Sequence, residues 1–252
     1  MTFKKIIATD LDGTFLRPDH SFDKKRLTRI LDQFEEKGYL FVAASGRSLA
    51  SIQSVFAGFE DRMGFIAENG SLVTYQDEVI YRDQPIAPET YLAIADGIAA
   101  SPFGATTQIL LSGHESAYVL ASADPTYLSY IRPYYQLQLV NSFTEVAVPI
   151  VKIVGTFGEK DLKAGQAWVN SHFLSVTAVT TGFDSVDIIL SGINKAVGLD
   201  KLCQHLGLSA TDVIAFGDNE NDLEMLEFAG LAVATSNAQD SAKERADLVI
   251  GS

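Results

Sequence analysis

The chain has 252 residues, 47% of them hydrophobic, and its 19 basic and 32 acidic residues give a formal net charge of −13. This excess of acidic residues argues against a general nucleic-acid surface, which needs clustered Lys and Arg, and the longest apolar runs are too short to cross a membrane. The single cysteine, Cys203, cannot form an internal disulfide and the N-terminus lacks the features of an export signal, so we expect a cytoplasmic protein.

The first third of the chain alternates apolar runs with segments of helical periodicity. Leu27, Leu31 and Phe34 recur at helical spacing, and Gly38 is a stop signal for that helix. Continuous apolar strands separated by helices are typical of a parallel sheet that is covered on both faces. Strands are predicted at residues 3–10, 39–45 and 63–70, helices at 21–38 and 49–59, and a hairpin at 71–83.

From about residue 82 the pattern changes to neighbouring strands with few helices between them, which is typical of a separate α+β unit. Helices are predicted at 88–100, 125–135 and 159–172, and strands at 106–112, 116–122, 136–140, 150–157, 175–181 and 185–190.

Strand–helix alternation resumes near residue 190 and continues to the end of the chain. We therefore predict an α/β core formed by residues 1–81 and 190–252, interrupted by an inserted α+β cap domain at 82–189. In the second part of the core, helices are predicted at 192–207 and 220–230, and strands at 212–218, 231–234 and 246–250.

Polar clusters follow three of the predicted core strands, in "IIATDLDGT", "FVAASGR" and "VIAFGDNEND". Ligands of open parallel sheets bind beyond the carboxyl ends of the strands, so we expect the three clusters to converge. Asp10 and Asp12 would repel each other if both were charged and close. A bound metal, a proton held by one of them, or exposure to solvent would each relieve this repulsion.

The sequence lacks the motifs of several other kinds of site. A calcium-binding EF-hand loop beginning at Asp10 would need Gly at its sixth position and Glu at its twelfth, where Phe15 and Ser21 stand, and a loop beginning at Asp218 fails in the same way. No G-x-G-x-x-G follows the first strand and no G-x-x-x-x-G-K-[ST] occurs. Ser45 lacks both glycines of a G-x-S-x-G nucleophile elbow.

Four segments in this order, "DLDGTFL", "ASGR", "GINKAVGL" and "GDNENDLEML", resemble the four motifs of the haloacid dehalogenase superfamily of phosphatases. The large insertion between the second and third, with "AENG" just before it, resembles the Cof-type subfamily and its α/β cap. The segments "SAYV" and "TTGFDSVDIILSGINKA" resemble bacterial sugar phosphatases. The resemblance implies a Rossmann-like parallel-sheet core and a magnesium-dependent hydrolase of small phosphomonoesters, above all sugar phosphates.

By this resemblance Asp10 is the nucleophile that forms an aspartyl phosphate, and Asp12 is the general acid and base. Mg²⁺ is held by the carboxylate of Asp10, the backbone carbonyl of Asp12 and Asp218, with Asp222 as a possible supporting acid. A cation there would offset the repulsion between a carboxylate and a phosphate dianion. The paired acids thus have different roles, one on the metal and one carrying a proton.

The resemblance also implies that Ser45, the backbone of Gly46, Lys195 and Asn221 bind the phosphate. We expect Ser45 and Gly46 at the start of a helix, where free amides favour an anion. Arg47 is expected to be an exposed arginine of that helix, and the imidazole of His20 to lie at the surface.

Within the inserted domain, His114 and Phe183 lie at strand ends without an evident role in the core, which makes them candidates for the surface that selects the substrate. The expected partner is a small phosphorylated metabolite, with no nucleic acid and no membrane, and the protein is expected to be a monomer or a weak homodimer. Three alternatives stay open: a phosphatase of cofactors such as flavin mononucleotide or pyridoxal phosphate, a phosphotransferase or mutase of the same superfamily, and a non-catalytic sensor that binds a phosphorylated metabolite.

Overall fold

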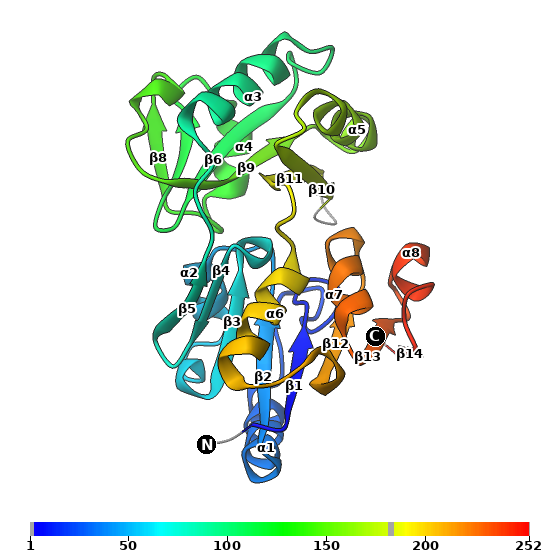
Figure 1. Cartoon of the computed structure of the whole chain (residues 1–252). Coiled ribbons are helices and arrows are strands. Elements are labelled where there is room, and N and C mark those ends of the chain that lie inside the picture. The colour runs from blue at the N-terminus through cyan, green and yellow to red at the C-terminus, as the bar shows by residue number, and fades with distance from the viewer. Residues whose placement is uncertain (1–2, 181–183, 252) are drawn as a thin grey trace. The chain divides into compact units, whose positions relative to one another are not determined.

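The computed structural model describes residues 3–180 and 184–251, and the chain separates into two compact units (Figure 1). The core unit comprises Met1–Arg82 and Ile193–Ser252, and the inserted unit is Asp83–Gly192. The chain therefore leaves the core unit after Arg82 and returns to it at Ile193.

The core unit is built on a sheet of order β14-β13-β12-β1-β2-β3-β4-β5, which has eight strands in the described part of the chain. The central strand β1 is parallel to β2 on one side and to β12 on the other. Pairing stays parallel from β14 to β3, and β4 and β5 are antiparallel to their neighbours. The strands are β1 Lys5–Thr9, β2 Tyr39–Ala44, β3 Met63–Ala67, β4 Leu72–Tyr75, β5 Glu78–Arg82, β12 Val213–Gly217, β13 Leu231–Thr235 and β14 Leu248–Ile250.

Helices cover both faces of the core sheet. Leu27 of α1 and Ile52 of α2 are buried in the apolar cluster on one face. Leu199 of α6, Met225 of α7 and Ala242 of α8 belong to the cluster on the other. The parallel-sheet core predicted from the continuous apolar strands is confirmed. The helices are α1 Lys24–Lys37, α2 Leu49–Val55, α6 Lys195–Leu206, α7 Leu223–Phe228 and α8 Asp240–Lys243, with 3-10 turns at Glu60–Arg62, Glu68–Gly70, Ala210–Asp212 and Glu220–Asp222.

Helix ends differ from the sequence prediction in places where periodicity continues past a break in the backbone. The helix predicted at 49–59 ends at Val55, and the chain then turns at Gly58 with φ of 92°. The helix predicted at 220–230 is divided, because a 3-10 turn comes before α7. Gly38 caps α1 in the left-handed conformation, as predicted.

The inserted unit is built on a second sheet, of order β10-β11-β9-β6-β7-β8, with six strands among the described residues. All neighbours are antiparallel except β7 and β8. Ile153 of β9 faces the helices α3 and α5, whereas its neighbour Val154 faces α4. The strands are β6 Gln108–Gly113, β7 Ala117–Leu120, β8 Leu137–Val140, β9 Ile150–Thr156, β10 Val176–Thr180 and β11 Ser185–Leu190; the helices are α3 Pro88–Ala100, α4 Pro125–Ile131 and α5 Leu162–His172, with a 3-10 turn at Phe143–Glu145.

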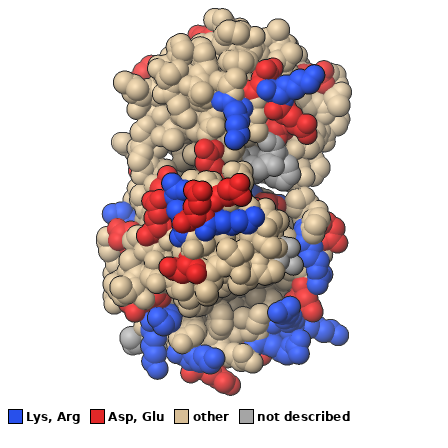
Figure 2. All heavy atoms as spheres, turned by 90° about the vertical axis from the view of Figure 1, so that its right-hand side faces the viewer, with Lys and Arg blue, Asp and Glu red and all other residues tan. Residues whose placement is uncertain are grey.

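The surface carries charged side chains of both signs. On the face drawn in Figure 2, Lys and Arg lie beside Asp and Glu over the middle of the face, and Lys and Arg predominate at its lower end. Across residues 3–180 and 184–251, no helix combines the length and the apolar character that crossing a bilayer requires.

Candidate active site

The candidate active site lies at the carboxyl ends of three parallel strands. Asp10 directly follows β1, Ser45 directly follows β2 and Asp218 directly follows β12. The backbone N–H of Asp10 donates to the carbonyl of Phe216 at 2.9 Å, which continues the pairing of β1 with β12 to the end of the strand. The three polar clusters therefore meet at one edge of the core sheet, where parallel sheets bind their ligands.

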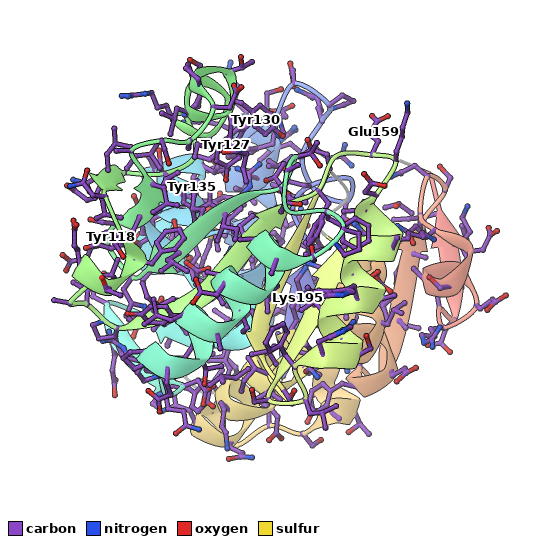
Figure 3. The ribbon with its side chains drawn as sticks, turned by 90° about the horizontal axis from the view of Figure 1, so that it is seen from above. Tyr118, Tyr127, Tyr130, Tyr135, Glu159 and Lys195 are labelled. Atoms are coloured by element: carbon purple, nitrogen blue, oxygen red, sulfur yellow. The ribbon has the colours of Figure 1, made fainter. Side chains whose placement is uncertain are left out.

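Lys195, which is labelled in Figure 3, bonds two of the acids at this edge. It is the first residue of α6, and its Nζ donates to Asp10 Oδ1 at 2.5 Å and to Asp222 Oδ1 at 2.6 Å. The Lys195 side chain is fully buried. Burial alone would lower the pKa of Lys195, but the two carboxylates raise it above its ordinary value. The side chain is therefore held as an ammonium between two acids.

Asp222 organises the loop that follows β12. Its Oδ2 accepts the backbone N–H groups of Asp218 at 2.9 Å and Asn219 at 3.0 Å, while its Oδ1 accepts from Lys195. The Asp222 side chain is completely buried. Both of its oxygens are engaged, so Asp222 fixes the position of Asp218 and of the ammonium together.

Asp10, Asp218 and Asp222 place a carboxylate oxygen each within 4.8 Å of one another. Burial raises the pKa of Asp10 well above its usual range; the charge of Lys195 opposes this, and those of Asp222 and Asp218 add to it. Burial also raises the pKa of Asp218 to about 6. When ionised, three carboxylates around one ammonium leave negative charge uncompensated. Hard oxygen ligands with excess negative charge fit a divalent cation such as Mg²⁺.

The loop after Asp10 packs closely against Asp218. Thr14 Oγ1 donates to Asp218 Oδ1 at 2.6 Å. Gly13 has φ of 90°, and a Cβ atom at this position would lie 2.4 Å from Asp218 Oδ2. Only glycine combines this backbone conformation with so close an approach. Thr14 therefore holds Oδ1 of Asp218, and the absence of a side chain at Gly13 leaves room for Oδ2.

The carboxylate of Asp12 is bound by two basic side chains. Arg47 donates from Nε to Asp12 Oδ2 at 2.7 Å and from Nη2 to Asp12 Oδ1 at 2.5 Å. The prediction of an exposed Arg47 is wrong, because its side chain is only 16% exposed and lies on Asp12. His20 is at the surface as expected, at 41% exposed, and its Nδ1 also lies 3.2 Å from Asp12 Oδ1.

Ser45 and Gly46 lie in the loop between β2 and α2. They precede Ser48, the N-cap of α2, so the expectation that they open the helix is wrong. The Ser45 side chain is nearly inaccessible, and its Oγ accepts the N–H of Arg47 at 3.2 Å. This hydrogen bond closes a tight turn around Gly46, the residue whose backbone was expected to bind phosphate.

Asn221 lies in the 3-10 turn before α7 and donates from Nδ2 to Asn69 Oδ1 at 3.1 Å. Asn69 follows β3, is 1% exposed and was not among the residues selected from the sequence. Its segment "AENG" contributes to the family resemblance but carries no sign of a contact with Asn221, since no spacing pattern connects residues 152 positions apart.

Of the two candidate recognition residues in the inserted unit, the structure describes one. His114 lies in the turn between β6 and β7 and is partly buried. Phe183 lies outside the described residues.

Comparisons with known proteins agree with the four motifs. Residues 7–252 match the family model of the haloacid dehalogenase-like hydrolases. The 5-amino-6-(5-phospho-D-ribitylamino)uracil phosphatase of Escherichia coli (strain K12) is 28% identical over 236 residues, covering 93% of this chain and 86% of its own. The pyridoxal phosphate phosphatase of the same strain is 26% identical over 266 residues, covering 98% and 93%.

Among solved structures, a crystal structure of a Streptococcus mutans UA159 protein is similar over 97% of this chain and 92% of its own, with a TM-score of 0.91 and 27% identity. The family match covers both parts of the core unit and the whole inserted unit between them. The chain therefore belongs to the haloacid dehalogenase-like hydrolase family and is one of its phosphatases.

Proposed function

We propose that the protein is a magnesium-dependent phosphomonoester hydrolase that works through an aspartyl phosphate on Asp10. The observation that carries this proposal is the buried group in which Lys195 bonds both Asp10 and Asp222 beside Asp218, at the carboxyl edge of a parallel sheet. A fixed ammonium next to a buried carboxylate is a suitable environment for a carboxylate nucleophile that attacks a phosphate.

Asp10 would attack phosphorus with one carboxylate oxygen while Lys195 holds the other, Oδ1, in place. The approach of a carboxylate to a phosphate dianion is repulsive, and a nearby ammonium in a low-dielectric site opposes that repulsion. Ser45, the Gly46 amide and Asn221 would bind the phosphoryl oxygens from the loops on either side.

The carboxylates of Asp10 and Asp218 and the backbone carbonyl of Asp12 would hold Mg²⁺, with Asp222 fixing the loop that carries Asp218. When bound, Mg²⁺ supplies positive charge that polarises the phosphoryl group and offsets the charge of the attacking carboxylate.

Asp12 would protonate the leaving alcohol and then deprotonate the water that hydrolyses the aspartyl phosphate. Both of its oxygens accept from Arg47 in this structure. Proton transfer to a leaving group therefore requires that one oxygen be released from the guanidinium, with the pairing holding Asp12 in one orientation until then.

For the substrate we propose small phosphorylated metabolites, with sugar phosphates as the first class to test. One relative is named for a substrate that carries its phosphate on a ribityl chain, which has the chemistry of a sugar alcohol. The name of the other supports the cofactor phosphatase as the second candidate. We propose that the inserted unit supplies the choice between these classes, with His114 among its recognition residues.

The test is a turnover screen with Mg²⁺ over sugar phosphates, pyridoxal phosphate, flavin mononucleotide and p-nitrophenyl phosphate, with Asp10→Asn as the control variant. We expect hydrolysis by the wild-type protein and none by Asp10→Asn, whose circular dichroism spectrum should be unchanged because the side chain keeps its volume. Binding of a phosphorylated metabolite without turnover of any substrate would favour the sensor instead.

A further inference from the structure

The segment that follows β3 has an unusual backbone. Glu68, Asn69 and Gly70 have φ of 49°, 55° and 104°, so three successive residues are in the left-handed region. Residues other than glycine rarely adopt it, and Asn does so more readily than Glu. Glu68 and Asn69 are each 1% exposed. A buried left-handed run persists only where the surrounding contacts require it.

Those contacts reach the loop of Ser45 and Gly46 through the backbone. The N–H of Asn69 donates to the carbonyl of Ser45 at 3.1 Å, and the N–H of Glu68 donates to the carbonyl of Arg47 at 3.0 Å. The two hydrogen bonds lie on either side of Gly46. The left-handed conformation points both N–H groups at this loop, and an extended segment could not do so.

The side chain of Asn69 reaches a second loop, because its Oδ1 accepts from Asn221 Nδ2 at 3.1 Å. An amide NH₂ has two hydrogens, so this bond uses one and leaves the other for a further acceptor. The bond also fixes the orientation of the Asn221 amide, because the NH₂ group and not the carbonyl oxygen must point toward Asn69. At the next residue, a Cβ on Gly70 would lie 2.0 Å from the carbonyl oxygen of Asn194, so the same segment lies against the residue that precedes Lys195.

We propose that Asn69 is a positioning residue for phosphate binding, which sets the Ser45–Gly46 loop through its amide and the donor orientation of Asn221 through its side chain. This rests on the proposed function, in which Ser45, Gly46 and Asn221 bind the phosphoryl oxygens. Without the Asn69 acceptor, the Asn221 amide can turn its carbonyl oxygen toward the phosphate, and an acceptor facing an anion is repulsive.

The test separates the side chain of Asn69 from its backbone. Asn69→Gly is compatible with the left-handed conformation and removes the buried side chain, including the Oδ1 acceptor of Asn221. We expect KM for p-nitrophenyl phosphate and the inhibition constant of inorganic phosphate to rise about tenfold, with a much smaller change in kcat, since one hydrogen bond is lost. The matched control is Gln76→Gly, at a left-handed residue in the β4–β5 turn with φ of 49°, which should leave both constants unchanged.

The coupling to Asn221 gives an independent measurement. In an Asn221→Ala protein, Asn69 has no amide donor to orient. Adding Asn69→Gly to that protein should therefore raise the inhibition constant of inorganic phosphate only slightly further. Asn69→Asp retains an acceptor oxygen and tolerates the left-handed region, but its charge would itself repel phosphate, so its readout is the Asn221 side chain. The side-chain amide protons of Asn221 should keep their hydrogen-bonded NMR shifts in Asn69→Asp and lose them in Asn69→Gly. This comparison still tests the proposal if the glycine variant does not fold in the Asn221→Ala background.

Wild-type phosphate inhibition in Asn69→Gly would overturn the inference while leaving the phosphatase intact, and so would full additivity with Asn221→Ala. Absence of any hydrolysis by the wild-type protein would instead overturn the proposed function, and this inference with it.

Discussion

Arg47 binds Asp12 through two hydrogen bonds, Nε to Oδ2 at 2.7 Å and Nη2 to Oδ1 at 2.5 Å. A planar guanidinium can bond both oxygens of a carboxylate at once, which a lysine ammonium does not reproduce. We expect Arg47→Lys to lower kcat for an alkyl phosphate about tenfold, because Asp12 loses its fixed orientation. Steady-state kinetics would measure this, and an unchanged kcat would show that the pairing has no part in the rate.

The carboxylate of Asp12 itself is tested by Asp12→Asn, which keeps the shape and removes proton transfer. We expect turnover of alkyl phosphates to fall about 100- to 10,000-fold, the usual range for general acid–base help. An aryl phosphate, whose leaving group needs less protonation, should lose less. The comparison of the two substrates is the measurement, and equal losses on both would mean that Asp12 does not protonate the leaving group.

Lys195 is the buried cation between Asp10 and Asp222, so Lys195→Met should destabilise the fold as well as abolish turnover. Breaking a buried ion pair by removing one partner costs about 3–5 kcal/mol. The remaining carboxylates would take up protons in the folded state, so the stability of the variant should fall as pH rises. Denaturant unfolding at acidic and at neutral pH measures this. A loss of stability that is the same at both would contradict the charge argument.

In the proposed metal site, Asp218 would make magnesium binding depend on pH. Its pKa is raised by burial from the ordinary 3.8 to about 6, so the metal-free folded protein holds a proton that the unfolded chain has released. Stability of the metal-free protein should therefore fall as pH rises between these values. Because Mg²⁺ needs the ionised carboxylate, titration of Asp218 should lower its apparent affinity about tenfold per pH unit below pH 6, and the raised pKa of Asp10, the other proposed carboxylate ligand, should add to this dependence. Magnesium titrations across this range test the slope of the affinity, and denaturant unfolding of the metal-free protein tests the slope of the stability. A pH-independent affinity would remove Asp218 from the metal site.

Gly13 allows a test of the close approach to Asp218. In Gly13→Ala the new Cβ would lie 2.4 Å from Asp218 Oδ2, so the carboxylate must move and apparent magnesium affinity should drop. The matched control is Gly58→Ala, with φ of 92° and no atom within 4 Å of the added Cβ, which shares the backbone strain without the clash. Equal effects of the two variants on activation by magnesium would attribute the change to strain alone.

Much of the core could be predicted from sequence because its signals are local. Continuous apolar strands, helical spacing and Gly38 each act over a few residues, and the rule that parallel strands bind ligands at their carboxyl ends brings Asp10, Ser45 and Asp218 together. The early end of α2 was missed because apolar spacing continues through Phe56 while the backbone turns at Gly58.

The partners of these residues could not be predicted in the same way. Arg47 bonds Asp12, which is 35 residues away in the sequence, and Asn69 bonds Asn221, which is 152 residues away. Neither separation corresponds to a helical or strand periodicity that would reveal the contact. Arg47 also follows a short polar loop, where an exposed side chain is the usual outcome. Which acid an arginine binds depends on how the loops after β1 and β2 fold against each other, which only the three-dimensional structure gives.

The place of β1 in the sheet has a consequence for synthesis of the chain on the ribosome. Its partner on one side, β2, follows within a few dozen residues, but its partner on the other side, β12, is not made until residues 213–217. Throughout the translation of the inserted unit, one edge of an apolar strand has no neighbour to pair with. Unpaired edges of this kind associate with other chains. Nascent chains that stall before Val213 should therefore be the most prone to aggregate and the most dependent on chaperones that shield strand edges.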